Sequence, residues 1–191
     1  MNQLDFSKYY TYADYFKWQF EERVELLKGR VFKMSPAPNL RHQRIAGDIF
    51  FEMKNFLGKQ KCQVFIAPFD VRLPLPPEMI KNDKVDTVVQ PDLTVVCDES
   101  KLDKQGCIGA PDLVVEVLSP GNTKKEMRQK LEIYQSAGIT EYWLVDPEHE
   151  FVLVYTLNEA GKYQSSLPFV DEDRVPSNVL DGFELDLKEI F

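Results

Sequence analysis

The chain has 191 residues, of which 43% are hydrophobic and 12% aromatic, and its formal net charge is −8. This length and apolar content fit one globular domain over residues 1–191 and leave little room for a second. The negative charge argues against a large nonspecific phosphate-binding surface, because such affinity comes largely from Lys and Arg side chains.

The sequence shows no membrane or export signal. No apolar run approaches the ~20 residues that cross a bilayer, and the N-terminal residues lack the basic and apolar blocks of a signal peptide. We therefore expect a cytoplasmic protein with no membrane partner. Cys62, Cys97 and Cys107 are odd in number and lack paired C-x-x-C spacing, which predicts buried free thiols instead of a disulfide framework or zinc site.

The first half of the chain predicts a hairpin and a long helix. Two short apolar runs surround Lys28-Gly29, which is typical of a β-hairpin. Apolar residues at helical spacing follow Asn39, a suitable N-cap, and predict an amphipathic helix over 40–57. We expect residues 62–74 to be extended and the proline-rich segment 75–90 to form a mobile loop.

The second half alternates strands with one helix. Strands are predicted at 92–97 and 112–118, joined by a charged loop, and a second hairpin at 141–146 and 151–156. Between the strands at 112–118 and 141–146, Thr123 and Glu126 have the spacing of a capping box and predict a helix over 123–137. Residues 185–191 are predicted to form a closing turn. This order indicates an α/β fold in which the helices at 40–57 and 123–137 pack on one sheet.

Glu116 interrupts the apolar strand at 112–118 with a carboxylate. If this strand pairs antiparallel with 92–97 around a centred loop, Asp92 lies opposite Glu116 and Asp112 lies opposite Val96. Opposed carboxylates destabilise a sheet, and a divalent cation would compensate them because Mg²⁺ takes oxygen ligands. The alternatives are that Glu116 lies at a sheet edge or pairs with a basic residue in a structural bridge.

A lysine for this site must come from outside the strand, because Leu118 stands two positions after Glu116. The helix at 123–137 runs back along the strand, which brings Lys130 to about the level of Glu116. Its alternative role is an i,i+4 surface pair with Glu126.

Three further residues are weaker candidates. His42 lies on the apolar face of the first helix and points toward the sheet, as either a core histidine or a catalytic one. Glu25 alternates with apolar neighbours in the first hairpin and is either exposed or directed at the site. Asp70 is the weakest of the three.

Several motifs together resemble the Uma2 family of the PD-(D/E)XK nuclease superfamily. They are Pro91-Asp92, the run "PDLVVEVLSP", the helix carrying Lys130 and Tyr134, the run "AGITEYWLVDP" and the terminal "VLDGFELDLKEIF". The resemblance covers nearly the whole chain. It implies a restriction-endonuclease-like fold, with a mixed central sheet flanked by helices and a metal held by two acids on neighbouring strands.

The resemblance also assigns roles to individual residues. Asp92 and Glu116 match the two metal-binding acids, which would hold Mg²⁺ or Mn²⁺. "Glu-Val-Leu" departs from the family's acid-x-Lys pattern, and Lys130 matches the helix-borne lysine of members in which this residue is relocated. An additional acid is common near the start of such domains, and Glu25 and His42 are the candidates for that position.

The expected function is therefore metal-dependent phosphodiester hydrolysis by an endonuclease-like hydrolase. Nucleic acid is the expected partner, with DNA ahead of RNA, and a homodimer is left open. The alternative is a noncatalytic oligomerising or partner-binding module on the same fold, which the net charge and the lost acid-x-Lys pattern favour. Aromatic residues near the N-terminus could serve its interface, namely Tyr9, Tyr10, Tyr12, Tyr15, Phe16 and Trp18.

Overall fold

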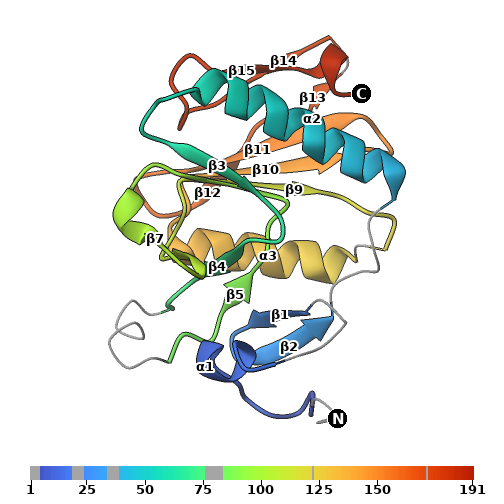
Figure 1. The fold of residues 1–191 in the computed structure, drawn as a ribbon. Helices are drawn as coiled ribbons and strands as arrows, with labels where there is room; N and C mark the ends of the chain where they lie inside the picture. The colour runs from blue at the N-terminus through green and yellow to red at the C-terminus, as the bar shows by residue number, and fades with distance from the viewer. Residues whose placement is uncertain (1–4, 19–23, 34–38, 76–83, 122, 171) are drawn as a thin grey trace.

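The computed structural model describes residues 5–18, 24–33, 39–75, 84–121, 123–170 and 172–191 (Figure 1). Its central sheet has the strand order β12-β11-β10-β9-β6-β3, with β13 paired to β11. Strands β9 and β10 are parallel and the other neighbours are antiparallel, so the sheet is mixed, as expected. The strands span Gln63–Ile66 (β3), Leu93–Val96 (β6), Leu113–Val117 (β9), Glu141–Asp146 (β10), Phe151–Leu157 (β11), Tyr163–Ser165 (β12) and Phe169–Val170 (β13).

Two long helices lie on opposite faces of this sheet, above and below it in Figure 1. Helix α2 spans Leu40–Leu57 and α3 spans Lys124–Ala137, so both predicted helices are confirmed. Side chains of α2 share a core with Val115 and Val117 of β9, whereas those of α3 share one with Val114. Alternate residues of a strand point to opposite faces, which explains this division.

Local signals account for the helix ends. Asn39 accepts a hydrogen bond from the backbone N–H of His42 at the start of α2. Thr123 and Glu126 form the predicted capping box of α3, and Gly138, at φ 81°, ends the helix in the left-handed region that favours glycine.

A second sheet lies beside α3, in the order β2-β1-β5-β4-β8-β7. The predicted hairpin forms β1 and β2, but the expected loops at 75–90 and 98–111 also contribute strands. That expectation is wrong for 84–90, whose buried Val88 and Val89 form β5, while 76–83 lie outside the described residues. The strands span Val24–Leu27 (β1), Arg30–Lys33 (β2), Asp70–Arg72 (β4), Val88–Val89 (β5), Leu102–Asp103 (β7) and Gly106–Ile108 (β8).

Several smaller elements complete the described part of the chain. Helix α1 spans Tyr12–Tyr15, and β14 (Arg174–Pro176) pairs with β15 (Glu184–Asp186). Single 3₁₀ turns span Glu99–Lys101 (η2) and Leu187–Glu189 (η3), the latter within the predicted closing turn. The N-terminal aromatics divide: Tyr9 and Phe16 are exposed, whereas four pack against the second sheet, namely Tyr10, Tyr12, Tyr15 and Trp18.

The prediction that all three cysteines are free thiols is wrong for two of them. Cys62 and Cys97 form a disulfide, and only Cys107 is free and buried. The pairing follows from the sheet, because Gln63 of β3 lies opposite Val96 of β6, so the residues just outside these strands are also opposite each other. This register cannot be read from cysteine spacing alone. No helix among the described residues is long and apolar enough to cross a membrane.

Candidate functional site

The β6–β9 ladder sets the position of the two candidate acids. Leu93 lies opposite Val115 and Val95 opposite Leu113, in an antiparallel pair with the predicted register. Continued by one residue, this register places Asp92 opposite Glu116. Side chains on both faces of this ladder pack into a core, so a slip of one residue would turn each of them to the opposite face.

Two Pro-Asp dipeptides perform matching structural roles at the two ends of this ladder. Asp92 Oδ2 accepts a hydrogen bond of 2.8 Å from the backbone N–H of Val117. Asp112 Oδ2 accepts one of 2.7 Å from the backbone N–H of Cys97. Each aspartate therefore satisfies the N–H at the end of the neighbouring strand. What distinguishes Asp92 is its second neighbour, the imidazole of His42.

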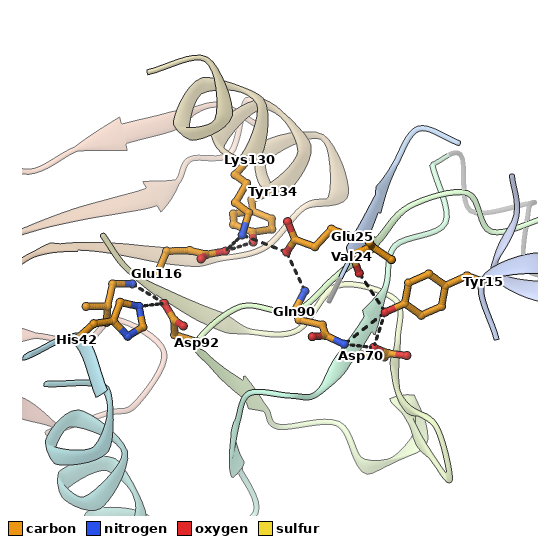
Figure 2. Close-up of polar contacts among 11 residues, drawn as sticks. Tyr15, Val24, Glu25, His42, Asp70, Gln90, Asp92, Glu116, Lys130 and Tyr134 are labelled. Atoms are coloured by element: carbon orange, nitrogen blue, oxygen red, sulfur yellow. Dashed lines mark hydrogen bonds and ion pairs between the residues drawn. The ribbon is translucent and has the colours of Figure 1, made fainter. Parts of the chain in front are cut away.

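Glu116 lies inside the central sheet and contacts α3 (Figure 2). Its Oε1 atom accepts hydrogen bonds from Lys130 Nζ at 2.8 Å and from the Tyr134 hydroxyl at 2.5 Å. The sheet-edge alternative for Glu116 is therefore wrong, whereas a bridge to a basic residue is present. The surface-pair alternative for Lys130 is also wrong, because Glu126 serves the capping box instead.

Glu25 of β1, in the second sheet, joins Glu116, Lys130 and Tyr134. Together with Asp92 and His42, these residues are called the acid–lysine cluster. Its Oε1 atom lies 3.1 Å from Lys130 Nζ and accepts a 3.0 Å hydrogen bond from the backbone N–H of Gln90. The side chain is only 7% exposed, which decides between the two orientations that the sequence left open. Lys130 thus bridges two glutamates from different sheets.

His42 is buried at the start of α2, with Nε2 3.3 Å from Asp92 Oδ2. Its Nδ1 atom is buried without a hydrogen-bond partner among the described residues. Burial acts to lower the pKa of His42, but the hydrogen bond and charge of Asp92 outweigh it and raise the pKa above 6.5. A protonated His42 would offset the charge of Asp92.

The buried charges perturb one another strongly. Desolvation and the charges of Asp92 and Glu25 raise the pKa of Glu116 to about 7, against the opposing effect of Lys130. For Lys130, burial acts to lower the pKa, but the charges of Glu116 and Glu25 raise it above its ordinary value. Two glutamates contact Lys130, so their charges exceed that of the one ammonium group, and Asp92 adds its negative charge near Glu116.

The sequence and fold of this chain match a known family. The pattern of the Uma2 family, described as "Putative restriction endonuclease", matches residues 12–188. The chain belongs to the Uma2 family. The crystal structure of "a putative nuclease belonging to DUF820" from Anabaena variabilis has the same fold: TM-score 0.74 and 20% identity over 95% of this chain and 97% of that one. No curated protein matches.

Asp92 and Glu116 are the two carboxylates of the cluster that could bind a metal, which would have to take its other ligands from water or substrate. Among the described residues, no group of three or more His, Cys, Asp or Glu side chains could hold an ion. The hydrogen bonds and ion pairs described above for Asp92 and Glu116 use Oδ2 and Oε1. Mg²⁺ is commonly bound by one or two carboxylates with waters and phosphate oxygens, so this donor set suits it.

Sequence reasoning missed the polar residues that support the cluster. The Gln90 side-chain amide donates to Asp70 Oδ1 at 2.8 Å, and the Tyr15 hydroxyl lies 3.5 Å from the same oxygen. Asp70 therefore contacts Gln90 and Tyr15 beside the cluster (Figure 2). The sequence assigns no role to Tyr134 beyond its place on the helix that carries Lys130. Its spacing of four from Lys130 puts both side chains on one helix face, which is the signal for a shared contact with Glu116.

Basic residues beside the cluster would favour the nuclease over the binding module, and the candidates are Arg41, Arg44, Lys124, Lys125 and Arg128. Arg41 pairs with Glu150, and Arg128 donates a hydrogen bond to Glu132 at 3.2 Å. Both arginines are therefore paired with acids outside the cluster. For Arg44, Lys124 and Lys125, no ion pair connects them to the cluster within the described ranges. The positive charge that lies in the cluster itself is Lys130.

Proposed function

We propose that Asp92, Glu116 and Lys130 form the active site of a metal-dependent phosphodiesterase. The observation that carries the proposal is the 2.8 Å contact between Lys130 Nζ and Glu116 Oε1, in a strand whose register sets Glu116 against Asp92. Two acids and a lysine at one place supply ligands for a cation and a positive charge for a phosphate. The membership of the Uma2 family supports the same reaction class.

The proposed metal is Mg²⁺ or Mn²⁺, held by Asp92 and Glu116. When bound, it would polarise the phosphate and lower the pKa of a coordinated water. Asp92 is already oriented by the Val117 backbone N–H, and Glu116 by Tyr134, so little reorganisation of either carboxylate is needed. Lys130 would neutralise charge that develops on the phosphate in the transition state.

Glu25 and His42 are proposed to position the three principal residues. Glu25 holds Lys130 from the opposite side to Glu116, which fixes the direction of the ammonium group. His42 lies against Asp92 and would balance its charge when protonated. Neither needs to contact the substrate for this role.

The proposed substrate is nucleic acid, with DNA ahead of RNA. The net charge of −8 favours a substrate engaged through few phosphates near the cluster over one wrapped along a broad surface. The rival function, a noncatalytic binding module, is favoured by the pairing of Lys130 with both glutamates, since a purely structural ion triad would have the same contacts.

Cleavage of a mixed panel of single-stranded, double-stranded and branched DNA and RNA tests the proposal. We expect wild-type protein to cleave a member of the panel with Mg²⁺ or Mn²⁺ and not with EDTA. Lys130→Met should reduce the rate by ~10²–10³, measured at a temperature where circular dichroism shows the variant folded. Lys54→Met, on the exposed side of α2, is the matched control. Absence of cleavage by wild type under all conditions would favour the binding module.

A further inference from the structure

A cavity of about 250 Å³ lies between the β1–β2 hairpin and α3, which we call the hairpin–helix cavity. The same two elements supply Glu25 and Lys130 to the acid–lysine cluster. The cavity is a separate place, because none of the cluster residues lines it. Its lining comes from the hairpin residues Leu27, Lys28, Arg30 and Phe32 and the α3 residues Gln129, Glu132 and Ile133.

The wall of the cavity combines an apolar floor with a cationic rim. Leu27 and Ile133 are buried and Phe32 is half-buried, whereas Lys28 and Arg30 are exposed. Two cations at one opening are notable in a chain of net charge −8. An apolar floor beside such a rim suits a ligand with a flat apolar part and an anionic end.

Gln129 adds a polar group that lacks a partner. Its side-chain oxygen Oε1 is buried and accepts no hydrogen bond from any described residue. A buried acceptor without a partner costs about 1–3 kcal/mol, so it is rarely retained unless a ligand or water satisfies it. Because Gln129 lines the cavity, a rotation of its side chain would turn Oε1 toward a ligand that carries an N–H or O–H donor on its apolar part.

We propose that the hairpin–helix cavity binds a nucleoside 5′-phosphate, either free or as the 5′ end of a strand. The base would lie on the floor made by Leu27, Phe32 and Ile133 and donate an N–H to Gln129 Oε1. The phosphate would be held at the rim by Lys28 and Arg30. The choice of a nucleotide over other aromatic anions rests on the proposed function, while the cavity, the orphan acceptor and the cations stand without it.

The remaining charged groups at the rim are compatible with an anion. Glu132 also lines the cavity, but Arg128 Nε donates to its Oε1 at 3.2 Å and offsets its charge. Arg30 donates one N–H to the carbonyl oxygen of Ser7, and a guanidinium has five donors, so others remain for a phosphate. Lys28 forms no ion pair within the described residues, and its backbone N–H is bound to Thr87.

Amide NMR titrations in EDTA test this site without any cleavage. The probes are 2′-deoxyadenosine 5′-phosphate, 2′-deoxyadenosine, inorganic phosphate, and a short oligothymidine with and without a 5′-phosphate. We expect the nucleotide to shift amide signals of 27–32 and 129–133 at lower concentration than the nucleoside or phosphate. If the 5′-phosphorylated strand binds more tightly than the free nucleotide, the source is a strand end; the reverse order identifies a free nucleotide.

Two variants separate the parts of the site. Lys28→Ala should weaken nucleotide binding at least about tenfold, because it removes a charged contact to the phosphate. Gln129→Leu should weaken nucleotide binding without changing phosphate binding, and should not lower stability because it removes an unsatisfied acceptor. The controls are Lys54→Ala and Gln43→Leu, which change the same residue types on the exposed side of α2.

The outcomes that overturn the site differ from those that overturn the nuclease proposal. Shifts confined to other residues, equal binding by both variants and wild type, or equal affinity for phosphate and nucleotide would each contradict it. A protein that cleaves nothing but shows the expected shifts would retain this site and lose the proposed reaction. A protein that cleaves but shows no shifts would do the opposite.

Discussion

Lys130 Nζ lies 2.8 Å from Glu116 Oε1 and 3.1 Å from Glu25 Oε1, so one ammonium group joins α3 to strands of both sheets. All three side chains are at most 18% exposed. An ion pair in such a place loses hydration on forming, and removing one member costs more than the pair contributes. Lys130 therefore affects stability as well as the proposed chemistry.

Lys130→Met should destabilise the metal-free protein by about 3–5 kcal/mol at pH 8, because it leaves two buried carboxylates without their cation. The loss should be smaller at pH 5, where Glu116, whose pKa is raised to about 7, is already protonated. Urea unfolding of wild type and variant at both pH values measures this. Lys54→Met should show no loss; equal losses at the two pH values would argue against the charge mechanism.

Glu116→Gln should become more stable relative to wild type as pH rises in EDTA. A carboxyl whose pKa is raised on folding, here from 4.5 to about 7, binds its proton more tightly in the folded state. Its contribution is therefore fully present below pH 4.5 and is lost as pH rises through 7. The stability difference should grow by up to about 3 kcal/mol across this window. Glu184→Gln, an exposed change in β15, should show no such trend.

Much of the fold could be predicted because its signals are local. Helices α2 and α3 have periodic apolar faces and recognisable caps, and their predicted bounds agree with the structure to within a residue. The register of β6 on β9 followed from a loop centred between them. The second sheet could not be predicted, because β5, β7 and β8 have only two or three residues and pair with partners far along the chain.

The candidate site was predictable where one element determines a neighbour's position. Helix rise alone brings Lys130 level with Glu116. The contact of Glu25 with Lys130 requires the second sheet to lie against α3, which no local pattern specifies. The same is true of Gln90, which contacts Glu25 through its backbone and Asp70 through its side chain. The Cys62–Cys97 bond likewise depends on a strand pairing that spacing does not reveal.

The two histidines should titrate differently after one substitution. Asp92 raises the pKa of His42 and Asp146 raises that of His149, so both should lie above 6.5 in wild type. Asp92→Asn should bring the pKa of His42 below 6.5, because burial then dominates, and leave His149 unchanged. Imidazole NMR signals followed from pH 5 to 9 measure both. A His42 pKa that does not respond would show that Asp92 is not its main partner.

Reduction should destabilise the protein through Cys62 and Cys97. Their bond joins residues 35 apart in sequence, and closing a loop of that length restricts the unfolded chain by about 3–4 kcal/mol. Unfolding with and without dithiothreitol measures the effect, and Cys62→Ser/Cys97→Ser should abolish it.

Burial raises the pKa of Cys107 to about 11, so this thiol should resist alkylation in the folded protein. Alkylation of all three cysteines without reductant would contradict the pairing.

The most direct test of the proposed active site compares the two Pro-Asp dipeptides. Asp92 and Asp112 each hold the backbone N–H of a neighbouring strand through Oδ2, so Asp92→Asn and Asp112→Asn disturb the ladder alike. Single-turnover cleavage with Mn²⁺, on the substrate that wild type cleaves best, is the measurement. Asp92→Asn should lose at least ~10²-fold in rate, while Asp112→Asn should keep the wild-type rate. Equal rates for the two variants, or no cleavage by wild type, would contradict the assignment of this cluster as a phosphodiesterase site.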